Sequence, residues 1–147
     1  MPTQLTAGHA KESLTTHVRT KGAEIFVKYG PQIGEPELTA LLRDRSAVRY
    51  PCTIAFDAAP LRPGEFAYPV PNGEKPEDGF RLCVHPHYRT QPALVPYLVL
   101  YQLVAVNYGE FASPEDAEEF GAAALGVDRE RYYQVLCHLA DQLKGES

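Results

Sequence analysis

Cysteine is scarce in this chain of 147 residues, and the few cysteines are not arranged in pairs. Cys52, Cys83 and Cys137 are odd in number, and none of them belongs to a CxxC motif. This spacing argues against a disulfide framework and against a structural zinc knuckle. We therefore expect a cytoplasmic protein, because free thiols stay reduced in that compartment.

Long apolar runs are also missing. The N-terminal segment MPTQLTAGHAKES has no apolar core, so we expect no signal peptide. The most apolar stretch, residues 92–106, is shorter than the roughly 20 residues that a membrane-spanning helix needs. It also contains Pro96 and Gln102. We interpret this stretch as a buried core helix and expect no membrane partner.

No long run of a single charge sign occurs. Fourteen Lys and Arg residues stand against nineteen Asp and Glu residues, and the two signs are mixed along the chain. The net charge of −5 and the absence of a basic stripe argue against nucleic acid as a partner. Apolar residues make up 44% of the chain, which is enough to bury a core. We expect a single domain over residues 1–147, with a disordered tail at residues 1–10.

Prolines and glycines divide the chain into short elements. The spacing of apolar residues predicts a first helix that Gly30-Pro31 ends and a short second helix that begins near Pro36. Three further helices are expected in the C-terminal part. They are a buried helix from Pro92 onward, a helix opened by a capping box at residues 113–116 and ended by Gly126, and a last helix over about residues 128–143.

The middle of the chain is predicted to be extended. Apolar and polar residues alternate in YPCTIAFD and in FRLCVH, which is the pattern of half-buried strands. A weaker strand is expected around residues 65–70, where Pro69 and Pro71 would confine it to a sheet edge. Strands grouped between helices indicate the α+β class. We expect a small, mostly antiparallel sheet packed on about five helices.

The buried helix carries a motif that resembles a catalytic one. VLYQLVAVNYG, residues 99–109, resembles the active helix of zincin-type metallopeptidases, in which an apolar lead precedes HELxH. There, two histidines one turn apart bind zinc and the glutamate acts as general base. Tyr101 and Ala105 stand at the histidine positions, and Gln102 stands at the glutamate position. The resemblance implies a zincin-like fold in which zinc hydrolysis through this helix is lost.

A second segment supports the same comparison. EDAEEFGAAALG, residues 115–126, is similar to the helix after HExxH in small gluzincins, and matching Ala117 and Phe120 puts Asp116 near the third-ligand position. The residues alone leave a plainer interpretation open. The capping box explains Asp116 by itself, and Gln102 is then a buried polar residue of an ordinary core helix.

A histidine pair is the other candidate site. Residues two apart on a strand face the same side, so His85 and His87 form a usable metal pair. Asp57 or Asp116 would complete the site. The alternative is a pair of partly exposed loop histidines. A nucleophilic pair of Cys52 or Cys83 with a histidine is the weakest option, because cysteines on strands are usually packing residues.

Two functional hypotheses follow. The first is a non-catalytic, metallopeptidase-like domain, a pseudoenzyme without a cofactor, that acts through a protein partner or as a homo-oligomer. The alternative is a metal-dependent hydrolase in which His85 and His87 bind zinc or another divalent metal. Nucleotide-binding glycine loops and the GxSxG motif do not occur in the sequence.

Overall fold

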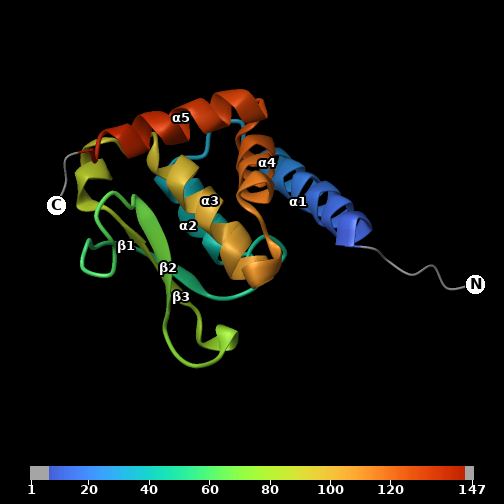
Figure 1. The fold of residues 1–147 in the computed structure, drawn as a ribbon, viewed down its shortest axis with the longest axis horizontal. Helices are drawn as coiled ribbons and strands as arrows, with labels where there is room; N and C mark the ends of the chain where they lie inside the picture. Colours follow the sequence, from blue (N-terminus) through green and yellow to red (C-terminus); the bar gives the residue numbers. More distant parts are fainter. Residues whose placement is uncertain (1–6, 145–147) are drawn as a thin grey trace, which may run out of the picture.

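The computed structural model describes residues 7–144, and their side chains from residue 13 onward. It confirms the α+β class, with five helices and three strands in the described range (Figure 1). The helices are α1 (Ala7–Tyr29), α2 (Glu35–Leu42), α3 (Val95–Tyr108), α4 (Pro114–Leu125) and α5 (Arg129–Asp141). The strands are β1 (Cys52–Phe56), β2 (Ala67–Pro71) and β3 (Phe80–Val84), and the 3₁₀ turns are η1 (Pro76–Asp78), η2 (Pro86–Thr90) and η3 (Gly109–Phe111).

The first helix is longer than expected. Helix α1 begins at Ala7, so residues 7–10 of the predicted disordered tail are helical, while residues 1–6 lie outside the described residues. The start of α1 contains alanine, lysine and glutamate and no proline, which favours helix over coil. The helix ends as predicted before Gly30-Pro31, where the Gly30 N–H still donates to the Phe26 carbonyl oxygen at 2.8 Å.

The sheet has the strand order β1-β3-β2 and is mixed. Strand β1 pairs with β3 in parallel, and β2 pairs with β3 antiparallel, so the expectation of a mostly antiparallel sheet is wrong for one of the two pairings. The most buried strand takes the centre: Leu82, Cys83 and Val84 of β3 are fully buried. Strand β2, with its prolines, lies at an edge as predicted, and this leaves β1 at the other edge.

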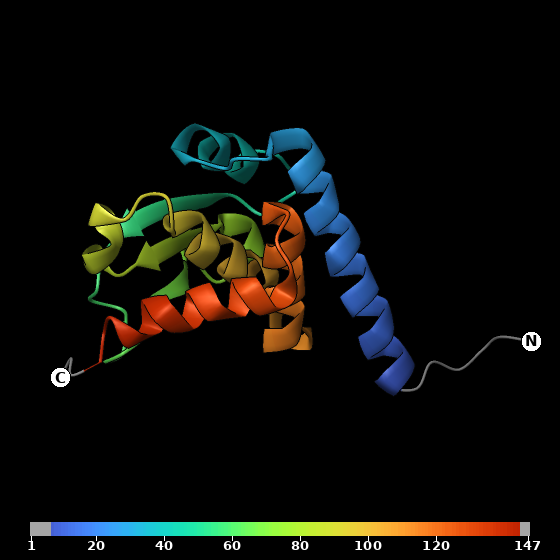
Figure 2. The same ribbon diagram turned by 90° about the horizontal axis from the view of Figure 1, so that it is seen from above.

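Helix α3 is the central element, as its apolar sequence predicts. It packs against β2, β3, α4 and α5, and most of its side chains are buried. Helix α1 runs along α4 (Figure 2) and contributes Val18 and Ile25 to the hydrophobic core. Within residues 7–144, no helix is both long and apolar enough to cross a lipid bilayer.

A carboxylate joins the end of α1 to the turn after α2. Asp44 accepts hydrogen bonds from Lys28 Nζ at 2.6 Å, Ser46 Oγ at 2.6 Å and Tyr29 Oη at 2.7 Å. The ammonium of Lys28, then the hydroxyl groups of Ser46 and Tyr29, hold the pKa of Asp44 well below its ordinary value. The ionised form is therefore favoured in the folded protein.

We expect the Asp44→Asn variant to be less stable than the wild type at pH 7. The pKa of Asp44 is lowered on folding, so its stabilising contribution is present above the unfolded-state pKa of about 4 and is lost as the pH falls below that value. Urea unfolding at several pH values from 7 to 2 should show that the free energies of unfolding of the two proteins approach each other as the pH falls. Asp141→Asn is the matched control, because Asp141 is largely exposed and pairs only with Lys144; a similar pH-dependent gap in that control would contradict the assignment.

Candidate functional site

The three positions of α3 that were compared with HExxH, namely Tyr101, Gln102 and Ala105, do not share one side of the helix. Ala105 is exposed and Tyr101 is half-buried, and the two lie one turn apart on the same stripe of the helix. The Tyr101 ring meets the ring of Phe66 edge to face, with centroids 6.1 Å apart. Burial, and next the charges of Glu118 and Glu115, raise the pKa of Tyr101. Gln102 is buried.

Asp116 is a structural cap. Its side chain is only 1% exposed, and Ser113 and Asp116 form the predicted capping box at the start of α4. One carboxylate oxygen accepts a hydrogen bond from the Ser113 N–H at 3.0 Å, and the other accepts one from Thr15 Oγ1 at 2.7 Å. The second bond ties α4 to α1. Asp116 therefore faces α1, whereas Tyr101 lies near Glu115 and Glu118 on another side of α4.

The histidine pair lies after the strand rather than on it. Strand β3 ends at Val84, and Pro86 begins the turn η2. His85 Nδ1 accepts a hydrogen bond from the His87 N–H at 3.1 Å, and His87 Nε2 lies 2.8 Å from Gln142 Oε1. Among the residues that the structure describes, no group of three or more His, Cys, Asp or Glu side chains is placed to hold a metal ion. The metal hypothesis stays a prediction.

Cys52 and Cys83, the two cysteines of the sheet, are poorly suited to act as nucleophiles. Cys83 is fully buried in the sheet. Burial raises the pKa of the Cys52 thiol to about 11, against a smaller opposing effect of Arg45. The thiol is therefore protonated at neutral pH, and a protonated thiol is a weak nucleophile.

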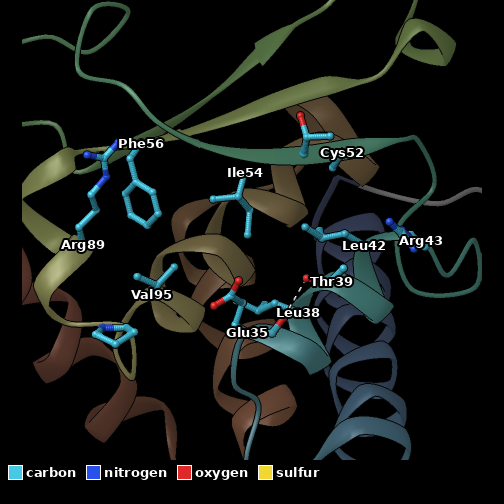
Figure 3. A pocket seen from close by; sticks show the side chains of 12 residues that line it. Glu35, Leu38, Thr39, Leu42, Arg43, Cys52, Ile54, Phe56, Arg89 and Val95 are labelled. Carbon is cyan, nitrogen blue, oxygen red and sulfur yellow. Dashed lines mark hydrogen bonds between the residues drawn. The ribbon is translucent and has the colours of Figure 1, made fainter.

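The structure contains a cleft that the sequence motifs did not reveal. It lies between α2 and β1 and has a volume of about 440 Å³ (Figure 3). Ile54 and Phe56 point from β1 into this space, and the apolar face of α2 forms the opposite wall. The lining residues are Glu35, Leu38, Thr39, Leu42, Arg43, Cys52, Thr53, Ile54, Phe56, Arg89, Pro92 and Val95. None of the four zincin-motif positions is among them.

The cleft lies beside an open sheet edge. The Phe80 N–H donates to the Pro51 carbonyl oxygen at 2.8 Å, and the Asp57 N–H donates to the Val84 carbonyl oxygen at 3.1 Å. In a parallel pair of strands, every second residue directs its N–H and C=O groups to the neighbouring strand. Pro51 does so with its C=O and Asp57 with its N–H, and therefore the backbone groups of the odd-numbered residues of β1 point toward β3. The N–H and C=O groups of Cys52, Ile54 and Phe56 point away from β3 and have no hydrogen-bond partner within residues 7–144.

The opposite edge of the sheet is blocked. The His85 N–H donates to the Phe66 carbonyl oxygen at 2.9 Å, and two residues further along the chain, Tyr68 lies opposite Cys83. The backbone N–H and C=O groups of the even-numbered residues of β2 therefore point toward β3. Pro69 and Pro71 therefore point outward, where they offer no N–H. Proteins commonly protect sheet edges with proline. Only the β1 edge keeps an N–H on each of its outward residues.

Neither the protein-family models, nor the curated proteins, nor the solved structures that were compared with this chain match it. The β1 edge and the cleft beside it are the features of this structure that indicate a binding site. The alternation of Cys52, Ile54 and Phe56 is a sequence signal for this site, because it shows which side chains share a face. It does not show that the strand lacks a neighbour.

Proposed function

We propose that this protein is a non-catalytic binding domain that acts through protein–protein interaction. It binds an extended segment of a partner protein, which pairs with β1 as an additional strand. The observation that carries the proposal is the row of unpaired N–H and C=O groups on Cys52, Ile54 and Phe56 beside an apolar cleft. Unprotected edge strands are templates for pairing with another chain.

The geometry matches the known physics of strand addition. Main-chain hydrogen bonds supply affinity in this mode, and pockets for every second side chain supply specificity. Cys52, Ile54 and Phe56 direct their side chains toward α2, so alternate side chains of an added strand would enter the same cleft. A volume of about 440 Å³ lies in the usual range for binding pockets, roughly 300–1,000 Å³.

The absence of catalysis in this proposal is supported by residue chemistry. Ala105 cannot ligate a metal, and Gln102 is a poor general base. The carboxylate of Asp116 accepts hydrogen bonds from Thr15 and Ser113, as its capping role requires. These features agree with a metallopeptidase-like domain without its metal ligands, and the proposed peptide-binding cleft lies apart from the motif positions.

The Ile54→Pro variant tests the proposed edge. Proline at an outward position of an edge strand removes no ladder hydrogen bond, but it removes the central donor that an added strand needs. We expect the variant to weaken binding of an extended peptide about tenfold or more. The probe is the acetylated and amidated heptapeptide Asn-Thr-Val-Thr-Val-Thr-Asn, titrated into the ¹⁵N-labelled full chain and followed by amide chemical shifts.

Binding should perturb the amides of Cys52, Ile54 and Phe56 and leave the outward amide of Ala67 on β2 unchanged. Ile54→Val is the matched control, since it keeps the N–H and an apolar side chain. Circular dichroism establishes that both variants fold. Shifts confined to other surfaces, or none at millimolar peptide, would overturn the proposal. Zinc-dependent cleavage of the peptide, lost in His85→Ala and His87→Ala, would instead support the hydrolase hypothesis.

A further inference from the structure

We propose, building on the function proposed above, that the bound segment carries an acidic residue at each end of an apolar, extended stretch. The two ends of the cleft are occupied by Arg43 and Arg89, which form no ion pair within the part of the chain whose side chains the structure describes.

The two arginines bracket the strand. Arg89 lies at the Phe56 end, with its guanidinium carbon 5.4 Å from the centre of the Phe56 ring. Arg43 lies at the Cys52 end, next to Leu42 (Figure 3). Neither forms an ion pair with a carboxylate within the described part of the chain.

Three other arginines pair with carboxylates, whereas Arg45, Arg49, Arg62 and Arg131, like the two at the cleft, have no ion pair among the described residues. Arg19 pairs with Glu119, Arg81 with Asp57, and Arg129 with Glu118. The chain as a whole is acidic, with a net charge of −5. Arg43 and Arg89 are nevertheless not engaged in an ion pair among the described residues. An acidic ligand group at each end would complete two charge-assisted hydrogen bonds.

The middle of the cleft has the opposite charge. Glu35 is the only carboxylate in the lining, and its side chain stands between the two arginines, across from Ile54 (Figure 3). A ligand acid at this central position would meet a like charge. The preferred ligand thus has acids at its ends and apolar residues between them. Because β1 spans five residues, or about 13 Å between its end residues, a segment of about seven residues covers the edge and both arginines.

Charge also argues against a second copy of this chain as the occupant. Antiparallel pairing of two β1 strands about Ile54 would set the Phe56 end of one copy against the Cys52 end of the other. Arg89 of one copy would then lie beside Arg43 of its mate, and like charges placed opposite one another disfavour a complex. A heterologous acidic segment meets no such repulsion.

Four heptapeptides with blocked ends test the inference. The neutral probe Asn-Thr-Val-Thr-Val-Thr-Asn is compared with versions that carry Asp or Lys at both ends. The fourth peptide, Asn-Asp-Val-Thr-Val-Asp-Asn, keeps two acids but turns them to the other face of the strand. We expect the Asp-ended peptide to bind about five- to tenfold more tightly than the neutral one at low salt, from two exposed ion pairs. The Lys-ended peptide should bind more weakly than the neutral one.

Two substitutions locate the effect. Arg43→Gln and Arg89→Gln should each reduce the ratio between the affinities of the Asp-ended and the neutral peptide, measured on the same variant. Arg62→Gln, an exposed arginine outside the cleft lining, is the control. Raising the salt from about 0.05 M to about 0.5 M should also shrink the advantage.

The outcomes separate this inference from the proposed function. If all four peptides bind the β1 edge equally, the edge function stands and the acidic preference is wrong. If none binds, the proposed function fails as well. If sedimentation shows a dimer that Ile54→Pro dissociates, a second copy occupies the edge and the inference is overturned. If both acidic peptides bind more tightly than the neutral one by the same factor, net charge rather than the position of the acids explains the gain. That result would overturn the inference.

Discussion

Replacing Tyr132 by alanine is expected to lower the free energy of unfolding by about 3–5 kcal/mol, the usual cost of removing a buried aromatic side chain. Tyr132 is fully buried on α5. Its ring stacks on Tyr97 of α3 with centroids 5.4 Å apart, and its hydroxyl donates to the Tyr97 carbonyl oxygen. The same ring fills the space beside Gly121 of α4, where an added Cβ would lie 2.2 Å from Tyr132 Cζ. One side chain therefore joins three helices.

Urea unfolding followed by circular dichroism measures this loss. Tyr132→Phe separates the ring from the hydroxyl and should cost only about 1 kcal/mol, the typical net value of one hydrogen bond. Tyr133→Ala is the positional control, because Tyr133 is the next residue on α5 and is half exposed; it should leave the unfolding midpoint nearly unchanged. Equal losses in Tyr132→Ala and Tyr133→Ala would contradict the packing argument.

Replacing Gly22 by valine is expected to cost about 2–3 kcal/mol through overpacking. Helix α1 packs mainly on α4, and Gly22 lies at the contact. A Cβ at this position would lie 2.5 Å from the Phe120 carbonyl oxygen and 2.7 Å from Ala123 Cβ. A backbone oxygen cannot rotate away as a flexible side chain can, so the two helices would have to separate.

Ala23→Val is the matched control for this effect, because Ala23 is the next residue on α1 and is exposed. Both variants introduce the same β-branched residue, but valine is a better helix former than glycine and a poorer one than alanine. Helix propensity alone therefore favours Gly22→Val over the control, so a larger loss of stability in Gly22→Val reports the α1–α4 contact. Thermal unfolding should show a clear drop in Tm for Gly22→Val only, and a Gly22→Val protein as stable as the control would show that the helices do not approach this closely.

Local elements of the fold could be predicted because their signals act over a few residues. Ser113 caps α4 as the SPED pattern predicts, and Gly126 ends the same helix in the left-handed conformation. Pro69 and Pro71 placed β2 at a sheet edge before any partner strand was known. Helix caps, helix ends and the loss of an N–H at proline are set by the residue itself and its near neighbours in the sequence.

The sheet topology and the candidate site could not be predicted in this way. The parallel pairing of β1 with β3 depends on contacts between segments almost thirty residues apart, and an alternating strand pairs equally well in either direction. The resemblance to zincins predicts a shared site for Tyr101, Gln102 and Asp116, but these residues face different surroundings in the structure. Whether the comparison with metallopeptidases holds stays a prediction.

The amino-acid sequence by itself determined the elements, the burial of α3 and the common face of Cys52, Ile54 and Phe56. Only the tertiary structure decided that these three residues lie on an edge with no neighbouring strand, that α2 stands across a cleft from them, and that Arg43 and Arg89 stand at its two ends. The physical reason is the separation along the chain over which each interaction acts. Helix caps and strand alternation are local, whereas an open edge exists only relative to every other segment of the folded chain.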